Sequence, residues 1–148
     1  MVDSRSFVLL LELATQDVEN AAKNLGHAIR VANEAKEQLN LLAQYRIDYE
    51  LRFQNTSQAG LAVTQLFNFR NFIGKLDTAI EGQKLILQDA EYKQEHYRLI
   101  WQESEKVRLS YQTLLNRQLK QAEHRDTQRE QKQADEFAAR KLFYKRNS

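Results

Sequence analysis

Apolar residues recur at alternating steps of three and four from Phe7 to Phe53. A mean spacing of about 3.5 residues held over such a length is typical of a coiled-coil seam, because the apolar stripe of a globular helix is wider and drifts with its turn. The pattern predicts one long helix over about residues 4–54. The seam positions, with Arg46 as the one polar member, are Phe7, Leu11, Ala14, Val18, Ala21, Leu25, Ala28, Ala32, Ala35, Leu39, Leu42, Arg46, Tyr49 and Phe53.

The repeat breaks across residues 55–60 and resumes at Leu66, which predicts a turn at about 55–61 and a second helix at about 62–140. The second seam runs through Leu66, Phe69, Ile73, Leu76, Ile80, Leu87, Ala90, Tyr97, Trp101, Tyr111 and Leu115, with polar interruptions at Gln83, Gln94, Ser104 and Arg108. A chain folded back at about residue 58 uses up its first helix when the second reaches about residue 112.

The predicted fold is therefore all-α, a single domain over residues 1–148 made of two long helices in an antiparallel coiled-coil hairpin. The second helix is the longer and ends in a C-terminal overhang, followed by a flexible basic tail over residues 141–148. Composition agrees, because proline is absent, only four glycines occur, and strong helix formers fill the gaps between apolar positions. No strand is predicted.

Composition also limits the environment of the chain. There is no cysteine, so neither a disulfide nor a thiolate metal site is possible, as is usual in a reducing cytoplasm. The apolar stretch from Phe7 to Leu11 is too short to span a bilayer, and no cleavage site of small residues follows it. We therefore expect a soluble intracellular protein without a transmembrane segment.

The charge is small but uneven. The formal net charge is +2, while residues 117–148 hold nine basic and five acidic residues, a local balance of +4. This end is only mildly basic and mixes both signs, whereas a nucleic-acid surface needs clustered cations interleaved with stacking aromatics. Nucleic acid is not a predicted partner.

Catalytic chemistry is not indicated. His27, His96 and His124 are scattered, and none has a glutamate three residues ahead, so the helical di-iron motif is missing and solvated histidines are expected. The sequence has no glycine-rich phosphate loop, no nucleophile elbow and no zinc spacing. We predict a protein that is not an enzyme and has no catalytic residue, cofactor or metal.

Near the turn, the apolar residues exceed what one seam requires. Two additional stripes lie at helical spacing, each predicted one step round from the core face: Gln38, Leu42, Tyr45 and Tyr49 on the first helix, and Phe72, Leu76, Ala79 and Gln83 on the second. An exposed aromatic patch on a soluble protein usually marks a binding surface. The alternative is that these side chains wrap the turn or pack against a second copy of the chain.

These features together resemble the FliJ family of bacterial flagellar export proteins over nearly the whole length, from about Leu10 to Arg140. The residues that carry the resemblance are the run Gln38-Leu39, Leu42, Tyr45 and Tyr49, the turn at Ala59-Gly60, the run Asn71-Phe72-Ile73, Leu76 and Ala79-Ile80, then Trp101, and finally Asp135-Glu136-Phe137-Ala138 with Arg140. The order, the spacing and the total length are shared with the family.

The resemblance implies a coiled coil similar to the central stalk of rotary ATP synthases, which inserts its paired termini into the hexameric flagellar export ATPase and promotes hydrolysis. It also implies contacts with the ATPase regulator, with export chaperones and with the export-gate membrane protein. The gate-binding face of the family corresponds to Gln38, Leu42, Tyr45, Tyr49, Phe72, Leu76 and Ala79, with Gln83 where the family pattern has a histidine.

We expect the ATPase contact at Asp135, Glu136, Phe137 and Arg140. The expected location is the cytoplasm, peripherally at the cytoplasmic face of the inner membrane beneath the flagellum, and the expected state in isolation is a monomer. Two alternatives share this architecture. One is a stalk component of a virulence type III injectisome, and the other is a structural adaptor that self-associates through the wide patch.

Overall fold

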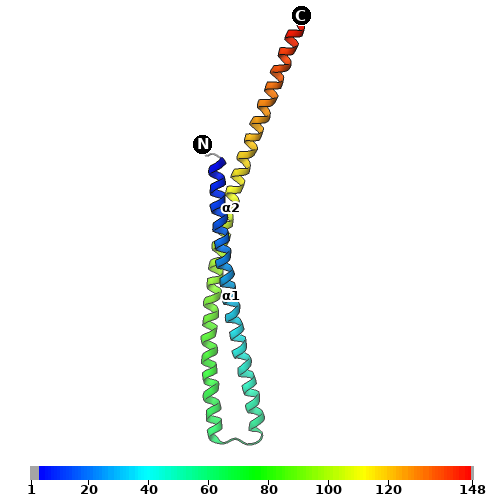
Figure 1. The fold of residues 1–148 in the computed structure, drawn as a ribbon. Coiled ribbons are helices and arrows are strands. Elements are labelled where there is room, and N and C mark those ends of the chain that lie inside the picture. Colours follow the sequence, from blue (N-terminus) through cyan, green and yellow to red (C-terminus); the bar gives the residue numbers. More distant parts are fainter. Residues whose placement is uncertain (1–3, 148) are drawn as a thin grey trace. The chain divides into compact units, whose positions relative to one another are not determined.

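The structure, a computed structural model, describes residues 4–147. Two helices account for nearly all of them: α1 spans Ser4–Ser57 and α2 spans Val63–Arg146 (Figure 1). No strand occurs among these residues, which confirms the prediction of an all-α chain with a longer second helix. The chain divides into two compact units, one of residues 19–102 and one in which residues 4–18 join the described residues from 103 onward.

Both helices end later than the sequence pattern predicted. α1 continues to Ser57 rather than about 54, so the connection shortens to residues 58–62. α2 continues to Arg146 rather than about 140, so most of the expected basic tail is helical. No glycine or proline interrupts the chain after Gly82. The positive charges of Lys145 and Arg146 in the last turn also stabilise the helix, because they lie at the negative end of its dipole.

The unit of residues 19–102 is a hairpin whose centre is built from alanine. Ala32, Ala35 and Ala90 form a buried cluster, and Leu87 packs against it. Ala21 and Ala28 are also buried. Such small side chains let two helix backbones approach closely, although each layer removes little apolar area from water.

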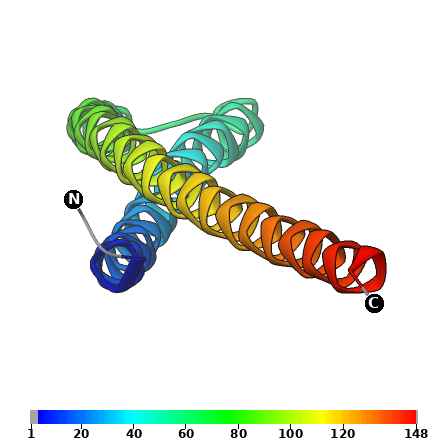
Figure 2. The ribbon, with the colours of Figure 1, turned by 90° about the horizontal axis from the view of Figure 1, so that it is seen from above.

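Towards the turn, the two helices of this hairpin move apart (Figures 1 and 2). Aromatic residues replace alanine in this part of the seam: Tyr49 and Phe53 on α1 face Phe69 and Phe72 on α2. Since an aromatic layer is wider than an alanine layer, the divergence follows from the order of residues along the seam.

The polar member of the first seam, Arg46, forms an ion pair across the hairpin. Its Nε donates to Asp77 Oδ1 at 2.5 Å, and its Nη1 donates to Glu50 at 2.9 Å on the same helix. The hydrogen bond to Asp77 is the main reason that the pKa of Arg46 lies above its ordinary value. Because these groups are partly exposed, the pair specifies which residues lie opposite each other more than it adds stability.

The other unit pairs the start of α1 with the middle of α2. Ala14 and Leu115 are buried there, and Phe7, Leu11 and Tyr111 are half-buried. From Leu119 to Asn147 every described residue is exposed. The expected overhang is therefore present as a single helix that no other part of the described chain covers.

Neither helix contains, within residues 4–147, a stretch long and apolar enough to cross a membrane. His27, His96 and His124 are exposed, as predicted. The described residues also hold no group of histidine and carboxylate side chains arranged to bind a metal ion.

Candidate functional site

The α1 half of the predicted binding surface is only partly free. Gln38 and Tyr45 are exposed, and the Tyr45 side chain is 49% accessible. Leu42 and Tyr49 are half-buried, and the Tyr49 ring packs on Phe69 and Phe72 of α2. Two of the four residues of the predicted stripe are therefore accessible, and the other two also belong to the hairpin interior.

The α2 half differs more from the prediction. Leu76 is 7% exposed and belongs to the core, so the expectation that it lies on a free stripe is wrong. Phe72 and Gln83 are half-buried, and Ala79 is exposed. Leu76 also occupies a position of the second seam, and the way in which α2 faces α1 places this residue inside.

Gln83 interrupts the apolar seam for a structural reason. Its side-chain Nε2 donates a hydrogen bond of 3.1 Å to the backbone carbonyl of Ala35 on α1. A helix carbonyl already accepts a backbone hydrogen bond, and its second lone pair takes this one. The Gln83 amide therefore links the two helices.

Aromatic rings connect the two stripes across the hairpin. Tyr45 meets Phe72 edge-on, with ring centroids 6.0 Å apart, and Tyr49 lies 4.5 Å from the same ring. These offset and edge contacts are favourable beyond their buried area. The alternative that the surplus side chains wrap the turn therefore accounts for Tyr49 and Phe72, whereas Gln38, Tyr45 and Ala79 remain available to a partner.

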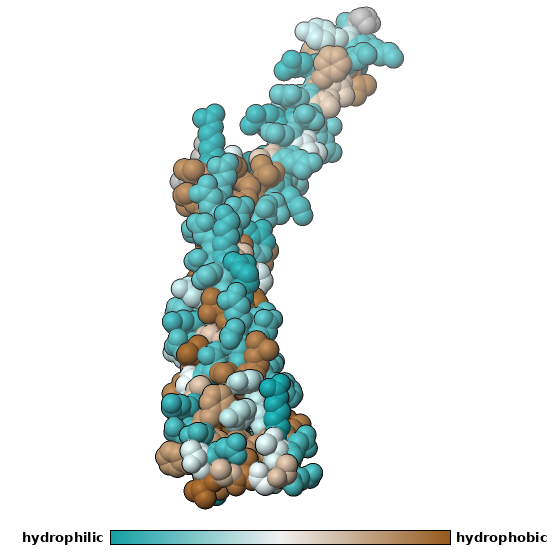
Figure 3. Space-filling model, turned by 60° about the horizontal axis from the view of Figure 1, so that its bottom comes forward, coloured by the Kyte–Doolittle hydropathy of each residue, from teal (hydrophilic) through white to brown (hydrophobic). Residues whose placement is uncertain are grey.

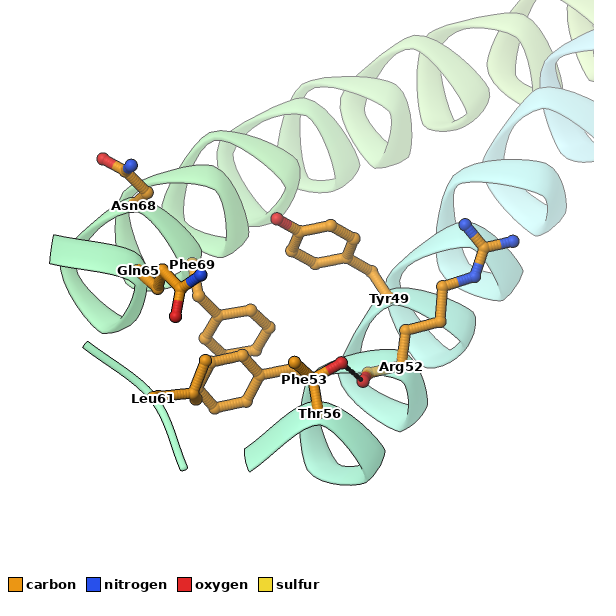
Figure 4. Close-up of a pocket in the computed structure, with 8 residues that line it drawn as sticks. All are labelled: Tyr49, Arg52, Phe53, Thr56, Leu61, Gln65, Asn68 and Phe69. Atoms are coloured by element: carbon orange, nitrogen blue, oxygen red, sulfur yellow. Dashed lines mark hydrogen bonds between the residues drawn. The ribbon is translucent and has the colours of Figure 1, made fainter. Parts of the chain in front are cut away.

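A cavity of about 300 Å³ lies at the turn, where the sequence pattern predicted no site. The residues that line it are Tyr49, Arg52, Phe53, Thr56, Leu61, Gln65, Asn68 and Phe69 (Figure 4). Phe53 and Phe69 stack across it with centroids 3.6 Å apart, and Tyr49 stacks on Phe69 at 5.3 Å. The one sequence feature that indicates this cavity is Leu61, an apolar residue directly after Gly60 in the turn.

The predicted ATPase-contact residues lie in the exposed part of α2. Asp135, Glu136, Phe137 and Arg140 are all solvent-accessible. Glu136 and Arg140 are four positions apart on α2, but they are not among the ion pairs of residues 4–147, which do include Glu95 with Arg98 and Glu105 with Arg108. The four side chains therefore present their charges and one aromatic ring to solvent.

Comparison with known proteins identifies the family of this chain. Residues 4–147 match the sequence profile of the family described as Flagellar FliJ protein. The chain is 32% identical over 136 residues to the Flagellar FliJ protein of Salmonella typhi, an alignment that covers 92% of each protein. It is 30% identical over 145 residues to the Flagellar FliJ protein of Escherichia coli strain K12, covering 98% of this chain and 99% of that relative. The chain therefore belongs to the flagellar FliJ protein family.

Proposed function

We propose that this protein is a non-enzymatic, central-stalk-like activator of the hexameric flagellar export ATPase. Family membership makes the chain a component of the flagellar export apparatus. The finer role, in which the end of the molecule enters the ATPase ring and promotes hydrolysis, is supported by the form of α2.

The observation that carries the proposal is the exposed helix from Leu119 onward. A mostly polar helix that its own chain leaves uncovered gains no stability from burial, and one role of such a helix is to bridge to another domain or partner. This one also ends in exposed apolar side chains, including Phe137, Leu142 and Phe143. A partner that surrounds the helix could contact these side chains on all faces, and the central hole of a ring has that geometry.

The test is an ATPase assay with the purified export ATPase of the same organism. Adding this protein should raise the rate of phosphate release and the fraction of ATPase found as hexamer, since a stalk bound in the hole stabilises the ring by mass action. Phosphate release and cross-linked oligomers are measured over a range of molar ratios. Unchanged hydrolysis at every ratio would contradict the proposal.

We also propose that the exposed residues Gln38, Tyr45 and Ala79 contact the export-gate membrane protein. Leu42, Tyr49, Phe72 and Gln83 border this surface, and the buried Leu76 supports it from inside the hairpin. Such contacts would hold the protein at the cytoplasmic face of the inner membrane. We propose that the ATPase regulator and the export chaperones also bind it there. The family match favours the flagellar system over an injectisome.

Replacing Tyr45 with alanine should weaken binding to the soluble part of the gate protein by about tenfold, because a large aromatic ring with a polar tip is a typical interface anchor. Phe72→Ala should also weaken binding, but it removes a ring that packs on Tyr49. Tyr92→Ala is the matched control, since Tyr92 is 76% exposed on α2 of the same hairpin. Titration calorimetry measures the affinities, and equal affinities for Tyr45→Ala and Tyr92→Ala would exclude Tyr45 from the site.

A further inference from the structure

We propose a second docking site, at the hairpin tip, for a protein segment that carries a leucine or phenylalanine flanked by acidic residues. The hairpin tip is defined as residues 51–76, which form the end of α1, the turn and the start of α2. This site goes beyond the proposed role as an ATPase activator. Of the residues considered for gate contact, Tyr49 lines the recess, and Phe72 and Leu76 lie within the hairpin tip but outside the lining of the recess.

The recess at the hairpin tip is small and mostly apolar. Its cavity of about 300 Å³ is at the lower limit of ligand pockets and suits one branched or aromatic side chain. Its apolar surfaces are the rings of Tyr49, Phe53 and Phe69 and the side chain of Leu61, while Gln65 adds an amide group (Figure 4). An apolar recess with a few polar groups binds one hydrophobic anchor and orients the backbone that carries it.

The turn beside the recess has a backbone geometry fixed by glycine and by hydrogen bonds. Gly60 has a φ of 90°, a conformation that side chains disfavour, and the N–H of Ala59 and of Gly60 donate to the carbonyls of Thr56 and Ser57. At the start of α2, the Gln65 side chain accepts a hydrogen bond of 3.2 Å from the N–H of Ala62. Both helix ends are capped, so Leu61 is fixed between them.

The charged residues of the hairpin tip are all basic. The hairpin tip contains Arg52, Arg70 and Lys75 and no aspartate or glutamate. The flanking acids are engaged elsewhere: Glu50 and Asp77 accept from Arg46, and Asp48 accepts from Gln44. An uncompensated group of cations around an apolar recess favours a partner with negative charge beside its hydrophobic anchor.

Arg52 places a positive charge beside the recess. Its side chain lines the cavity and extends along α1 beside Tyr49 (Figure 4), and its guanidinium has no ion-pair partner among residues 4–147. A long arginine with free donors can form a bidentate contact with a carboxylate at the mouth of the cavity.

The surface around the recess carries exposed apolar side chains. Leu51, Val63 and Phe67 are exposed at the tip. Figure 3 shows hydrophobic side chains gathered at this end of the hairpin, among polar ones. A concave recess with exposed apolar side chains around it suits a short protein segment that inserts one hydrophobic side chain. Binding to a bilayer surface requires instead an apolar face that projects outward.

The test uses the full chain and a fluorescein-labelled peptide, Ser-Glu-Asp-Leu-Phe-Asp-Glu-Ser, with binding measured by fluorescence anisotropy. Two further peptides isolate the two requirements: one has the four acids replaced by their amides, and the other has Leu-Phe replaced by Ala-Ala. The acidic Leu-Phe peptide should bind about tenfold more tightly than either, since each change removes one class of contact. It should also shift the methyl NMR signals of Leu61.

Arg52→Glu should weaken binding of the acidic peptide by about tenfold and leave the amide peptide unaffected. Lys36→Glu is the matched control, because Lys36 is an exposed cation of the same helix outside the hairpin tip. Since the overhang is unchanged, stimulation of the ATPase should persist in Arg52→Glu, which separates this site from the proposed function.

Equal binding of the acidic and amide peptides, or equal effects of Arg52→Glu and Lys36→Glu, would overturn the proposal. If the peptide binds without changing the Leu61 methyl signals, it binds elsewhere on the protein, and the recess is not its binding site. If the protein sediments with phosphatidylglycerol vesicles but does not bind the peptide, the ligand of the hairpin tip is a membrane surface and the proposed protein partner is wrong.

Discussion

Deleting residues 119–148 should abolish stimulation of the export ATPase while leaving the hairpin of residues 19–102 folded. All of residues 119–147 are exposed, so their removal should change the free energy of unfolding of the remaining fold little. It also removes all the residues proposed to enter the ring. Phosphate release reports the functional loss, and thermal unfolding followed by circular dichroism reports the stability of what remains.

A pair of single substitutions makes the same test without shortening the chain. Phe137→Ala removes an exposed ring from the overhang, and Phe67→Ala removes one from the hairpin tip. The two side chains have nearly the same exposure, 66% and 69%. We expect reduced stimulation only from Phe137→Ala, because an exposed aromatic ring becomes an anchor where a partner buries it. A truncated chain that still stimulates fully would rule out insertion through this segment.

Leu76→Ala should lower the free energy of unfolding by about 2–3 kcal/mol, because it removes a buried leucine and leaves a cavity beside α1. Leu85→Ala is the matched control on the same helix, where the leucine is 67% exposed and the expected change is within about 0.5 kcal/mol. Urea unfolding followed by the helical circular dichroism signal measures both variants.

This result affects how the gate-contact surface is mapped. If Leu76→Ala destabilises the hairpin as expected, weaker gate binding by that variant reflects altered packing rather than a lost contact. Gate binding of Leu76→Ala is therefore to be compared with that of Tyr45→Ala at a temperature where both are folded. Similar unfolding free energies for Leu76→Ala and Leu85→Ala would show instead that Leu76 is not a core residue.

The repeat of apolar residues was sufficient to predict both helices and their pairing. Seam positions such as Ala14, Ala32 and Leu115 are buried, as the three-four spacing requires. The overhang was predictable for the same reason, because a helix without an apolar stripe has nothing to pack with. Helix ends were less accurate, since a helix-forming sequence without glycine or proline lets the last turns extend until a capping feature ends them.

The candidate surface depended on information that periodicity does not contain. A stripe at helical spacing specifies a side of one helix, but not how far that side is rotated towards its neighbour. For this reason Tyr45 is accessible while Leu76, from the companion stripe, is in the core. Gln83 and Arg46 appear as interruptions in the sequence, and only their partners Ala35 and Asp77 on the opposite helix explain them.

The sequence by itself thus determined the secondary structure, the antiparallel pairing and the unpaired end of α2, because each follows from local propensity and from the spacing of apolar residues. The tertiary structure decided which surplus side chains are free, and it revealed the recess between Phe53, Leu61 and Phe69. That recess forms because wide aromatic layers spread the two helices beside a glycine turn, and this depends on contacts between residues that are distant in the chain.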